Sequence, residues 1–96
     1  MAENSKRQFI RLLIETYYTK NWADNVFRPK TIYDLFVSVC ILNHIDEEYN
    51  RKDLKPWQRR QRFEMWDYLW KRYETPELFW EEFGGMFPPE FLAEFE

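Results

Sequence analysis

Residues 31–45 read TIYDLFVSVCILNHI, and the fold class depends on what this stretch forms. Its apolar residues recur at helical intervals, and Thr31 with Asp34 is typical of a helix start, so the pattern predicts a helix over 31–45. The run from Phe36 to Leu42 is also rich in β-branched residues and would fit a buried strand. Because the sequence contains no second strand-like run to pair with it, we predict an all-α fold.

The same stretch is apolar on nearly every side, so we expect it to be the central, buried helix. Two more main helices are predicted, over about residues 6–20 and 56–73. Ser5 with Gln8 forms a capping-box pattern at the start of the first of them. Asp46 to Lys55 is polar, which predicts a loop or a short turn before the third helix.

Two short helices are predicted to close one side of the fold. Thr75-Pro76-Glu77 combines a cap residue, a proline suited to the first helical position and an acid in the first turn. Gly84-Gly85 should end that helix, and Pro88-Pro89 should open a last one. We therefore expect a small single-domain helical bundle over residues 1–96, with three main helices and an acidic, aromatic C-terminal segment at 74–96.

The composition excludes several classes of protein. With 96 residues, 21% of them aromatic, the chain is long enough for one core and too aromatic for global disorder. Two adjacent glycines leave no phosphate-binding loop, and a single cysteine leaves neither a disulfide framework nor a cysteine-rich zinc site. No apolar run is long enough for a membrane helix, and the polar N-terminus lacks a signal-peptide core. We expect a cytoplasmic protein with no cofactor, no metal and no membrane partner.

The charge is strongly segregated along the chain. The net charge is −3, yet residues 74–96 contain seven glutamates and no lysine or arginine. Residues 51–62 contain six basic residues and one acid. Such asymmetry can steer a partner or can hold one part of the molecule against another.

The first candidate site is the basic and aromatic stretch 51–70. Helical spacing places Arg59 and Arg62 in the same sector as Trp66, with Arg60 nearby, and this composition is typical of protein-interface hot spots. It would also suit single-stranded nucleic acid, where bases stack on rings and arginines meet phosphates. Two structural alternatives remain: the arginine stems cover the edge of the core, or their heads pair with the acidic C-terminal segment.

The second candidate site is the C-terminal segment, where aromatic residues alternate with glutamates. Trp80, Phe87 and Phe91 are the expected anchors if this segment docks in a groove of another protein. The alternative is that these rings complete the domain's own core. The Phe87–Pro88 bond could be either cis or trans.

The third candidate is Cys40 with His44, which are four residues apart and therefore neighbours on a helix. They could act as nucleophile and base, or as two metal ligands with Glu47 or Glu48 nearby, but the chain has only one His and one Cys and no oxyanion-binding turn beside them. A buried thiol and a histidine near a helix end explain the same residues. We expect no enzyme activity.

The sequence therefore predicts a non-catalytic protein-interaction module that docks on a larger protein or enzyme complex. It would act as an inhibitor or adaptor, including one encoded by a virus, and its target could be a nucleic-acid-processing enzyme. The alternative is direct nucleic-acid binding through residues 51–70. Self-association through the aromatic C-terminal segment is a third possibility.

Overall fold

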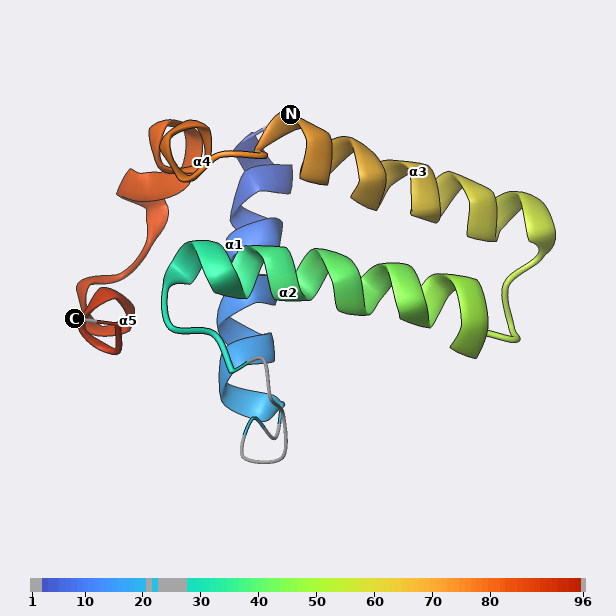
Figure 1. Cartoon of the computed structure of the whole chain (residues 1–96), viewed down its shortest axis with the longest axis horizontal. Helices are drawn as coiled ribbons and strands as arrows, with labels where there is room; N and C mark the ends of the chain where they lie inside the picture. Colours follow the sequence, from blue (N-terminus) through green and yellow to red (C-terminus); the bar gives the residue numbers. More distant parts are fainter. Residues whose placement is uncertain (1–2, 21, 23–27, 96) are drawn as a thin grey trace.

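The computed structural model describes residues 3–20, 22 and 28–95, with side chains from residue 5 onward. Within these ranges the chain forms helices and connecting segments and no strand, which confirms the predicted all-α class (Figure 1). The elements are α1 (Glu3–Thr19), α2 (Ile32–Ile45), the π-helical turn η1 (Asp46–Asn50), α3 (Pro56–Arg72), α4 (Pro76–Phe83), the 3₁₀ turn η2 (Gly84–Met86) and α5 (Pro89–Ala93).

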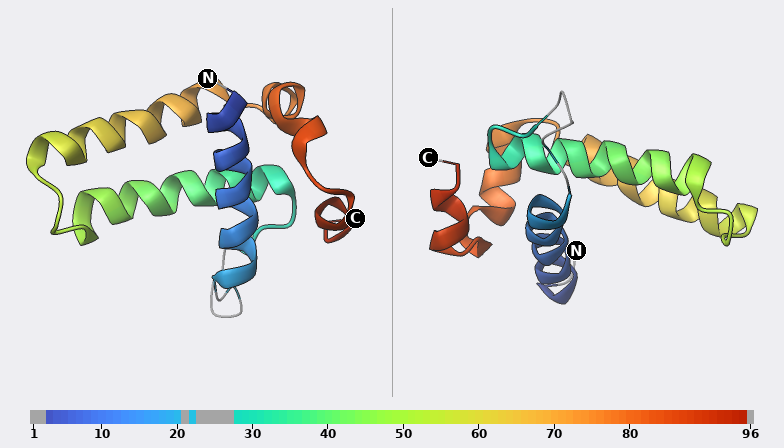
Figure 2. Two further views of the ribbon diagram at one scale, coloured as in Figure 1. Left: turned by 180° about the vertical axis from the view of Figure 1, so that it is seen from behind. Right: turned by 90° about the horizontal axis from the view of Figure 1, so that it is seen from below.

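The three long helices do not lie side by side, so the predicted bundle arrangement is not confirmed. α2 and α3 run antiparallel and form a hairpin, whereas α1 crosses this hairpin (Figures 1 and 2). α4 and α5 lie at the end of the hairpin where α2 begins and α3 ends.

Side-chain hydrogen bonds confirm two predicted helix starts. Thr31 Oγ1 accepts a 3.0 Å hydrogen bond from the N–H of Asp34, and Thr75 Oγ1 accepts one of 3.4 Å from the N–H of Leu78. Each bond satisfies an N–H that has no partner inside the first helical turn. α3 begins at Pro56, where proline was expected in the first turn.

One predicted boundary is wrong: α1 begins at Glu3, so Ser5 lies inside the helix and not at its start. Residues 46–55 were predicted to be a loop or a short turn, and they form the turn η1 followed by a loop. η1 closes with a 2.8 Å hydrogen bond from the N–H of Arg51 to the carbonyl of Asp46. The turn brings Glu47 to arginine side chains, a contact that sequence spacing alone does not reveal.

The core lies where α1, the first half of α2, the second half of α3 and the C-terminal helices meet. Phe36, Phe79 and Phe83 are fully buried at its centre. The Phe79 ring centroid lies 4.8 Å from that of Phe36 and 5.4 Å from that of Phe83. Aromatic pairs of this kind add about 0.5–1.5 kcal/mol each beyond the burial of their area. The other buried apolar residues are Phe9, Ile10, Leu13, Trp22, Ile32, Leu35, Val39, Cys40, Trp66, Leu69, Tyr73, Phe87 and Phe91.

The expectation that the helix at 31–45 is buried throughout is wrong for its second half. Its buried residues end at Cys40, and Ile41 and Ile45 are 47% and 45% exposed. The cause is the position of α1 and of the C-terminal helices, which cover only the first half of α2 (Figure 1).

The molecule therefore has two parts. We call residues 41–65 the hairpin arm: it comprises the second half of α2, η1, the loop that follows and the first half of α3. The remaining described residues, which include the whole apolar core, form the body. The arm extends away from the body past α1, in a molecule whose principal extents are 40 × 34 × 21 Å (Figures 1 and 2).

Candidate docking surface

The hairpin arm contains no buried apolar residue, and Glu47 is its only buried residue. Its large apolar side chains are instead partly or largely exposed, up to 75% for Tyr49 and 62% for Trp57. Six of the eleven exposed large hydrophobic residues in the described part of the chain belong to the arm. They are Ile41, Ile45, Tyr49, Trp57, Phe63 and Met65.

Both helices of the arm contribute to this surface. Ile41 and Ile45 are four residues apart and so share one face of α2. Trp57 lies in the first turn of α3, directly after the proline that starts the helix. Phe63 stacks on His44 of α2, with ring centroids 4.5 Å apart, so its ring joins the two helices while its edge stays exposed. Apolar surface thus follows the arm along its length.

The two sides of the arm are held together by charges. Glu47 Oε1 lies 3.3 Å from Arg62 Nη1 and 4.0 Å from Arg51 Nη1. Arg51 also donates two 2.9 Å hydrogen bonds to the Asp53 carboxylate, and Arg59 Nη2 donates one of 2.7 Å to the Arg51 carbonyl. We call these five residues the Glu47 cluster. They connect η1 and the following loop to α3.

The Glu47 cluster also keeps the exposed carboxylate of Asp53 ionised. The hydrogen bonds from Arg51 favour the ionised carboxylate and lower the pKa of Asp53 to about 2. The Asp53 hydrogen bonds in turn raise the pKa of Arg51 above its usual range. Asp53 and Arg51 therefore remain a charged pair over the physiological pH range.

The contact between the two sides of the hairpin contains buried polar atoms without hydrogen-bond partners. Among the described side chains, four buried polar atoms have no hydrogen-bond partner: His44 Nε2, Glu47 Oε2, Arg59 Nε and Trp66 Nε1. Three of them belong to the arm and the fourth, Trp66, to the core beside it, whereas the described part of α1 and the C-terminal helices has none. Each such group costs about 1–3 kcal/mol, so from the three in the arm we infer that it is less firmly fixed than the body.

The three candidate arginines have different environments. Arg59 and Arg62 are bound within the Glu47 cluster, and Arg60 is exposed. The alternative in which these arginines pair with the acidic C-terminal segment is wrong, because α4 and α5 lie at the opposite end of the hairpin (Figure 1). Trp66 is 5% exposed, and its ring centroid lies 6.4 Å from that of Phe9, so this predicted partner-binding residue belongs to the core.

Acidic side chains of the C-terminal segment contact α1 and not the arginines of the arm. Glu82 pairs with Lys6 at 2.6 Å, and Glu94 accepts a 3.4 Å hydrogen bond from the Tyr18 hydroxyl. Both contacts hold the C-terminal helices to α1. The Lys6 ammonium lowers the pKa of Glu82, which keeps this pair charged.

Two of the three expected C-terminal anchors lie in the core. Phe87 and Phe91 are 5% and 2% exposed and stack on each other with centroids 5.8 Å apart. These rings complete the core of the chain itself, which was the alternative interpretation, and the Phe87–Pro88 bond is trans. Trp80 remains 40% exposed, although one edge of its ring covers Gly84, where a Cβ atom would lie 2.8 Å from the ring.

Cys40 and His44 do not form a nucleophile and base. Cys40 is 1% exposed, and burial raises its pKa to about 12, so the thiol stays protonated at neutral pH. The His44 ring is occupied by its stack on Phe63. Within the described part of the chain, no group of three His, Cys, Asp or Glu side chains could hold a metal ion.

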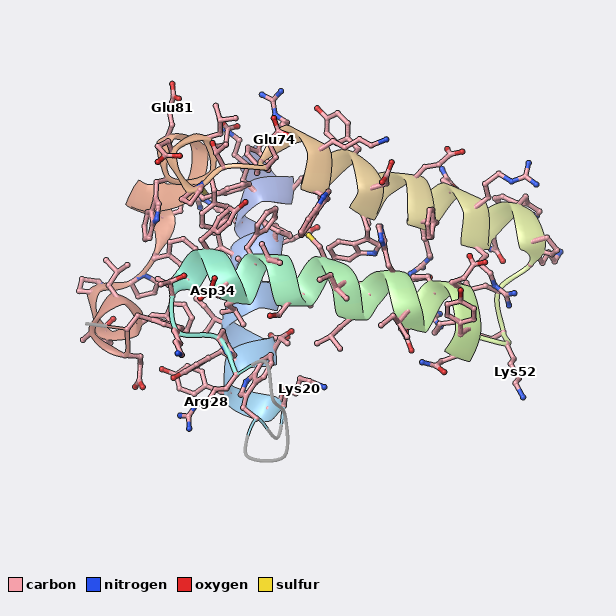
Figure 3. All side chains as sticks on the ribbon, viewed as in Figure 1. Lys20, Arg28, Asp34, Lys52, Glu74 and Glu81 are labelled. Carbon is pink, nitrogen blue, oxygen red and sulfur yellow. The ribbon has the colours of Figure 1, made fainter. Side chains whose placement is uncertain are left out.

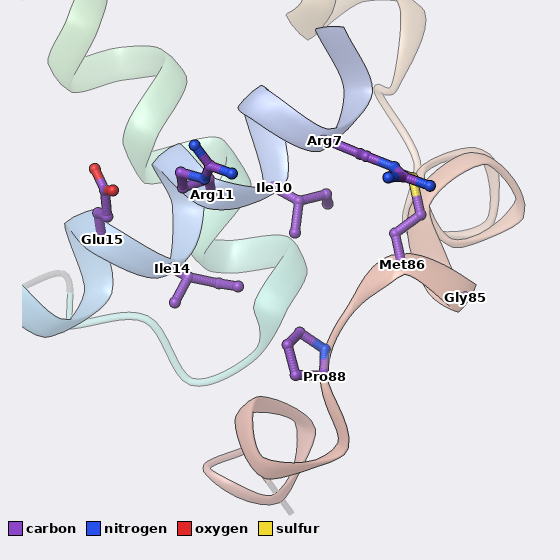
Figure 4. A pocket seen from close by; sticks show the side chains of 8 residues that line it. All are labelled: Arg7, Ile10, Arg11, Ile14, Glu15, Gly85, Met86 and Pro88. Atoms are coloured by element: carbon purple, nitrogen blue, oxygen red, sulfur yellow. The ribbon is translucent and has the colours of Figure 1, made fainter. Parts of the chain in front are cut away.

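A groove separates α1 from the segment that joins α4 to α5 (Figure 4). Ile10, Ile14 and Pro88 face one another across it, and Arg7 lies beside Met86. Arg11, Glu15 and Gly85 complete the lining. No histidine, cysteine or hydroxyl side chain is among these lining residues, so the groove offers apolar contact with a charged rim and no nucleophile.

Sequence reasoning missed most of the exposed apolar surface of the arm. Ile41 and Ile45 were assigned to a buried helix, and Tyr49 lay in a segment predicted as a polar loop. Phe63 and Met65 lay in the predicted third helix without being singled out as binding residues. The available signal was the position of Tyr49 and Trp57 in a stretch of mostly charged and polar residues.

None of the helices among the described residues has the length and apolar character needed to cross a membrane. Comparison with protein-family models, with curated proteins and with solved structures finds no match. Functional inference therefore rests on the chemistry of the arm and of the body surface.

Proposed function

We propose that this protein is a non-catalytic interaction module that docks its hairpin arm on a larger protein or protein complex and modulates it as an inhibitor or adaptor. One observation carries the proposal: the arm has no buried apolar side chain, although the partly buried Leu42 packs against the core, and it exposes six large ones. Exposed apolar surface of this kind marks interaction sites in proteins. An arm that extends from a packed body can also enter a concave site on its partner.

The residue types on the arm support this use. Tyr49 and Trp57 are its most exposed large side chains, and Arg60 is exposed on α3 near Trp57. Trp, Tyr and Arg are the residues that most often dominate the binding energy of protein interfaces. Because two rings are already exposed in the free protein, docking would not require the core to open.

The acidic C-terminal helices suggest one kind of target. Glu77, Glu81 and Glu90 are exposed, and a negatively charged face can meet the basic groove of an enzyme that handles nucleic acid. We therefore include nucleic-acid-processing enzymes among the candidate targets. The arm would supply apolar contacts and the acidic face would supply charge complementarity.

The test is capture of proteins from nuclease-treated lysate by the tagged chain, followed by mass spectrometry. Wild type is compared with the double variant Ile45→Gln/Trp57→Gln in the arm and with Trp80→Gln on the body, after circular dichroism shows equal helicity. We expect a stoichiometric protein that wild type and Trp80→Gln retain and that the arm variant loses. Loss with Trp80→Gln alone would place docking on the C-terminal helices and contradict the proposal.

Direct nucleic-acid binding is the second candidate, because Tyr49 and Trp57 are exposed near the exposed cations Lys52, Lys55 and Arg60. Exposed rings can stack on bases while such cations meet phosphates. The test is fluorescence anisotropy with a single-stranded oligonucleotide over a range of salt. About three phosphate contacts predict a slope of log K against log salt near −2. An unchanged anisotropy at low salt would exclude this function.

A further inference from the structure

A second groove lies on the body between the end of α3 and α4, far from the tip of the arm. The buried ring of Tyr73 lies among its lining residues. Its two sides have opposite charge: the α3 side contributes Lys71 and Arg72, and the α4 side contributes Glu81 and Glu82.

Each side of this groove also exposes one apolar side chain. Tyr68 on α3 is 57% exposed, and Leu78 on α4 is 44% exposed. Both line the groove, so each charged side lies next to an apolar contact. Each side therefore combines two charged side chains of one sign with one exposed apolar side chain, and the sign of the charge differs between the two sides.

Two of the charged side chains in the groove, Arg72 and Glu81, can still bind a further partner. Arg72 donates from Nε to the Tyr73 hydroxyl at 3.3 Å, which leaves its terminal nitrogens available. Glu81 points away from α4 into solvent (Figure 3) and has no ion-pair partner in the part of the chain that the structure describes. Lys71 and Glu82 differ, because they pair with Asp67 and Lys6 respectively.

We propose that this groove binds a second copy of the chain in a two-fold symmetric dimer. In such an interface one patch meets itself, so a residue i contacts j and j contacts i. Turning one copy about an axis through the groove brings the α3 side of each copy onto the α4 side of the other. Arg72 of each copy then meets Glu81 of its partner, and Tyr68 meets Leu78. The complementary surface that the groove requires is present on the same chain.

The dimer has a consequence for the arms. They lie outside the groove, so a dimer would present two arms from one assembly. Two docking surfaces on one assembly raise the apparent affinity for a repeated or dimeric target without any new contact. The dimer itself does not depend on whether the arm docks on a protein.

The test is sedimentation equilibrium of the purified protein over a range of concentrations and at low and high salt. We expect a monomer–dimer equilibrium that Arg72→Glu and Glu81→Arg each weaken about tenfold or more, because each change places two like-charge contacts in the dimer. The matched control is Glu77→Arg, which makes the same charge change on α4 outside the groove and should leave the equilibrium close to that of wild type.

Charge rescue makes the test specific. In an equimolar mixture of the Arg72→Glu and Glu81→Arg proteins, both charge contacts of a mixed dimer are attractive again, so dimer formation should return. The double variant Arg72→Glu/Glu81→Arg should also dimerise. Circular dichroism checks that each variant keeps its helicity. A monomer mass at every concentration, or a dimer that neither single variant weakens, would overturn the proposal.

Discussion

The body and the hairpin arm share two helices, α2 and α3, but are stabilised differently. In the body, α2 contributes five buried residues to an apolar core that extends from Phe9 to Phe91. In the arm, the continuation of α2 contributes only the partly buried Leu42, and the Glu47 cluster and one stacked ring pair hold the two sides together. A helix can therefore belong to the core for part of its length and present apolar side chains to solvent for the rest.

Charged contacts in the arm also allow its apolar side chains to face solvent. Because Glu47, Arg51 and Arg62 occupy the inner side, the arm keeps its shape without burying Ile45 or Trp57. Ion pairs of this kind contribute less than apolar burial. The arm thus combines a persistent shape with lower stability, as is common for segments that bind partners.

The largest difference between the body and the arm is expected in the unfolding free energy that is lost when a phenylalanine in each is changed to alanine. Phe79→Ala removes a fully buried ring from the body and should cost about 3–5 kcal/mol of unfolding free energy. Phe63→Ala removes a ring that is 37% exposed in the arm and should cost about 1 kcal/mol or less. Urea unfolding followed by circular dichroism measures both. Equal costs would show that the arm is part of the core.

A second prediction concerns the Glu47 cluster. Glu47→Gln removes the charge that Arg51 and Arg62 share, and it should cost about 1–3 kcal/mol of local stability. Hydrogen exchange should accelerate in residues 46–62 and remain unchanged in the body. The exposed neighbour variant Glu48→Gln should change neither. Faster exchange throughout the body would mean that the cluster supports the whole fold.

The starts of α2 and α4 could be predicted from sequence because they depend on contacts within one turn, at Thr31 and Thr75. The extent of burial along α2 could not, since Leu35 and Leu42 are seven residues apart on one face, yet Leu35 is fully buried and Leu42 only partly buried. No propensity in a single helix encodes where another helix crosses it.

The contacts of the candidate site could not be predicted for a similar reason. Arg59, Arg60 and Arg62 lie on the arm, and two of these arginines bind within the chain. Glu47, the partner of Arg62, lies fifteen residues before it, in the segment that was predicted as a loop or a short turn. Contacts at that separation depend on the hairpin and not on local spacing.

A third prediction uses Cys40 as a reporter of the body. Burial raises its pKa to about 12, so at pH 8 the thiolate is scarce and the thiol inaccessible. Labelling with a chromogenic disulfide reagent should be at least about a hundredfold slower in the folded protein than in urea. Glu47→Gln should leave this rate unchanged, because it loosens the arm alone. Rapid labelling of the native wild type would contradict the packed body.

The smallest expected effect is a titration in the arm. The pKa of Asp53 is lowered to about 2, so its contribution to arm stability is complete above its unfolded pKa of about 3.9 and is lost as the pH falls through about 2. Carbon NMR of the Asp53 carboxyl should show a midpoint near 2 in wild type. Arg51→Ala should return it toward its ordinary value. A wild-type midpoint at the ordinary value would show that the Arg51 pair does not persist in solution.

The central claim is that the core of the body stabilises the fold and that the exposed apolar side chains of the arm are available for contacts with other molecules. The most direct measurement is thermal unfolding of a variant in which all six exposed arm residues become glutamine: Ile41, Ile45, Tyr49, Trp57, Phe63 and Met65. The account predicts a cooperative transition with a midpoint within about 20 °C of wild type, because six surface changes of about 0.5 kcal/mol or less each sum to about 3 kcal/mol. Loss of the cooperative transition would show that these side chains hold the fold together, and the account would be wrong.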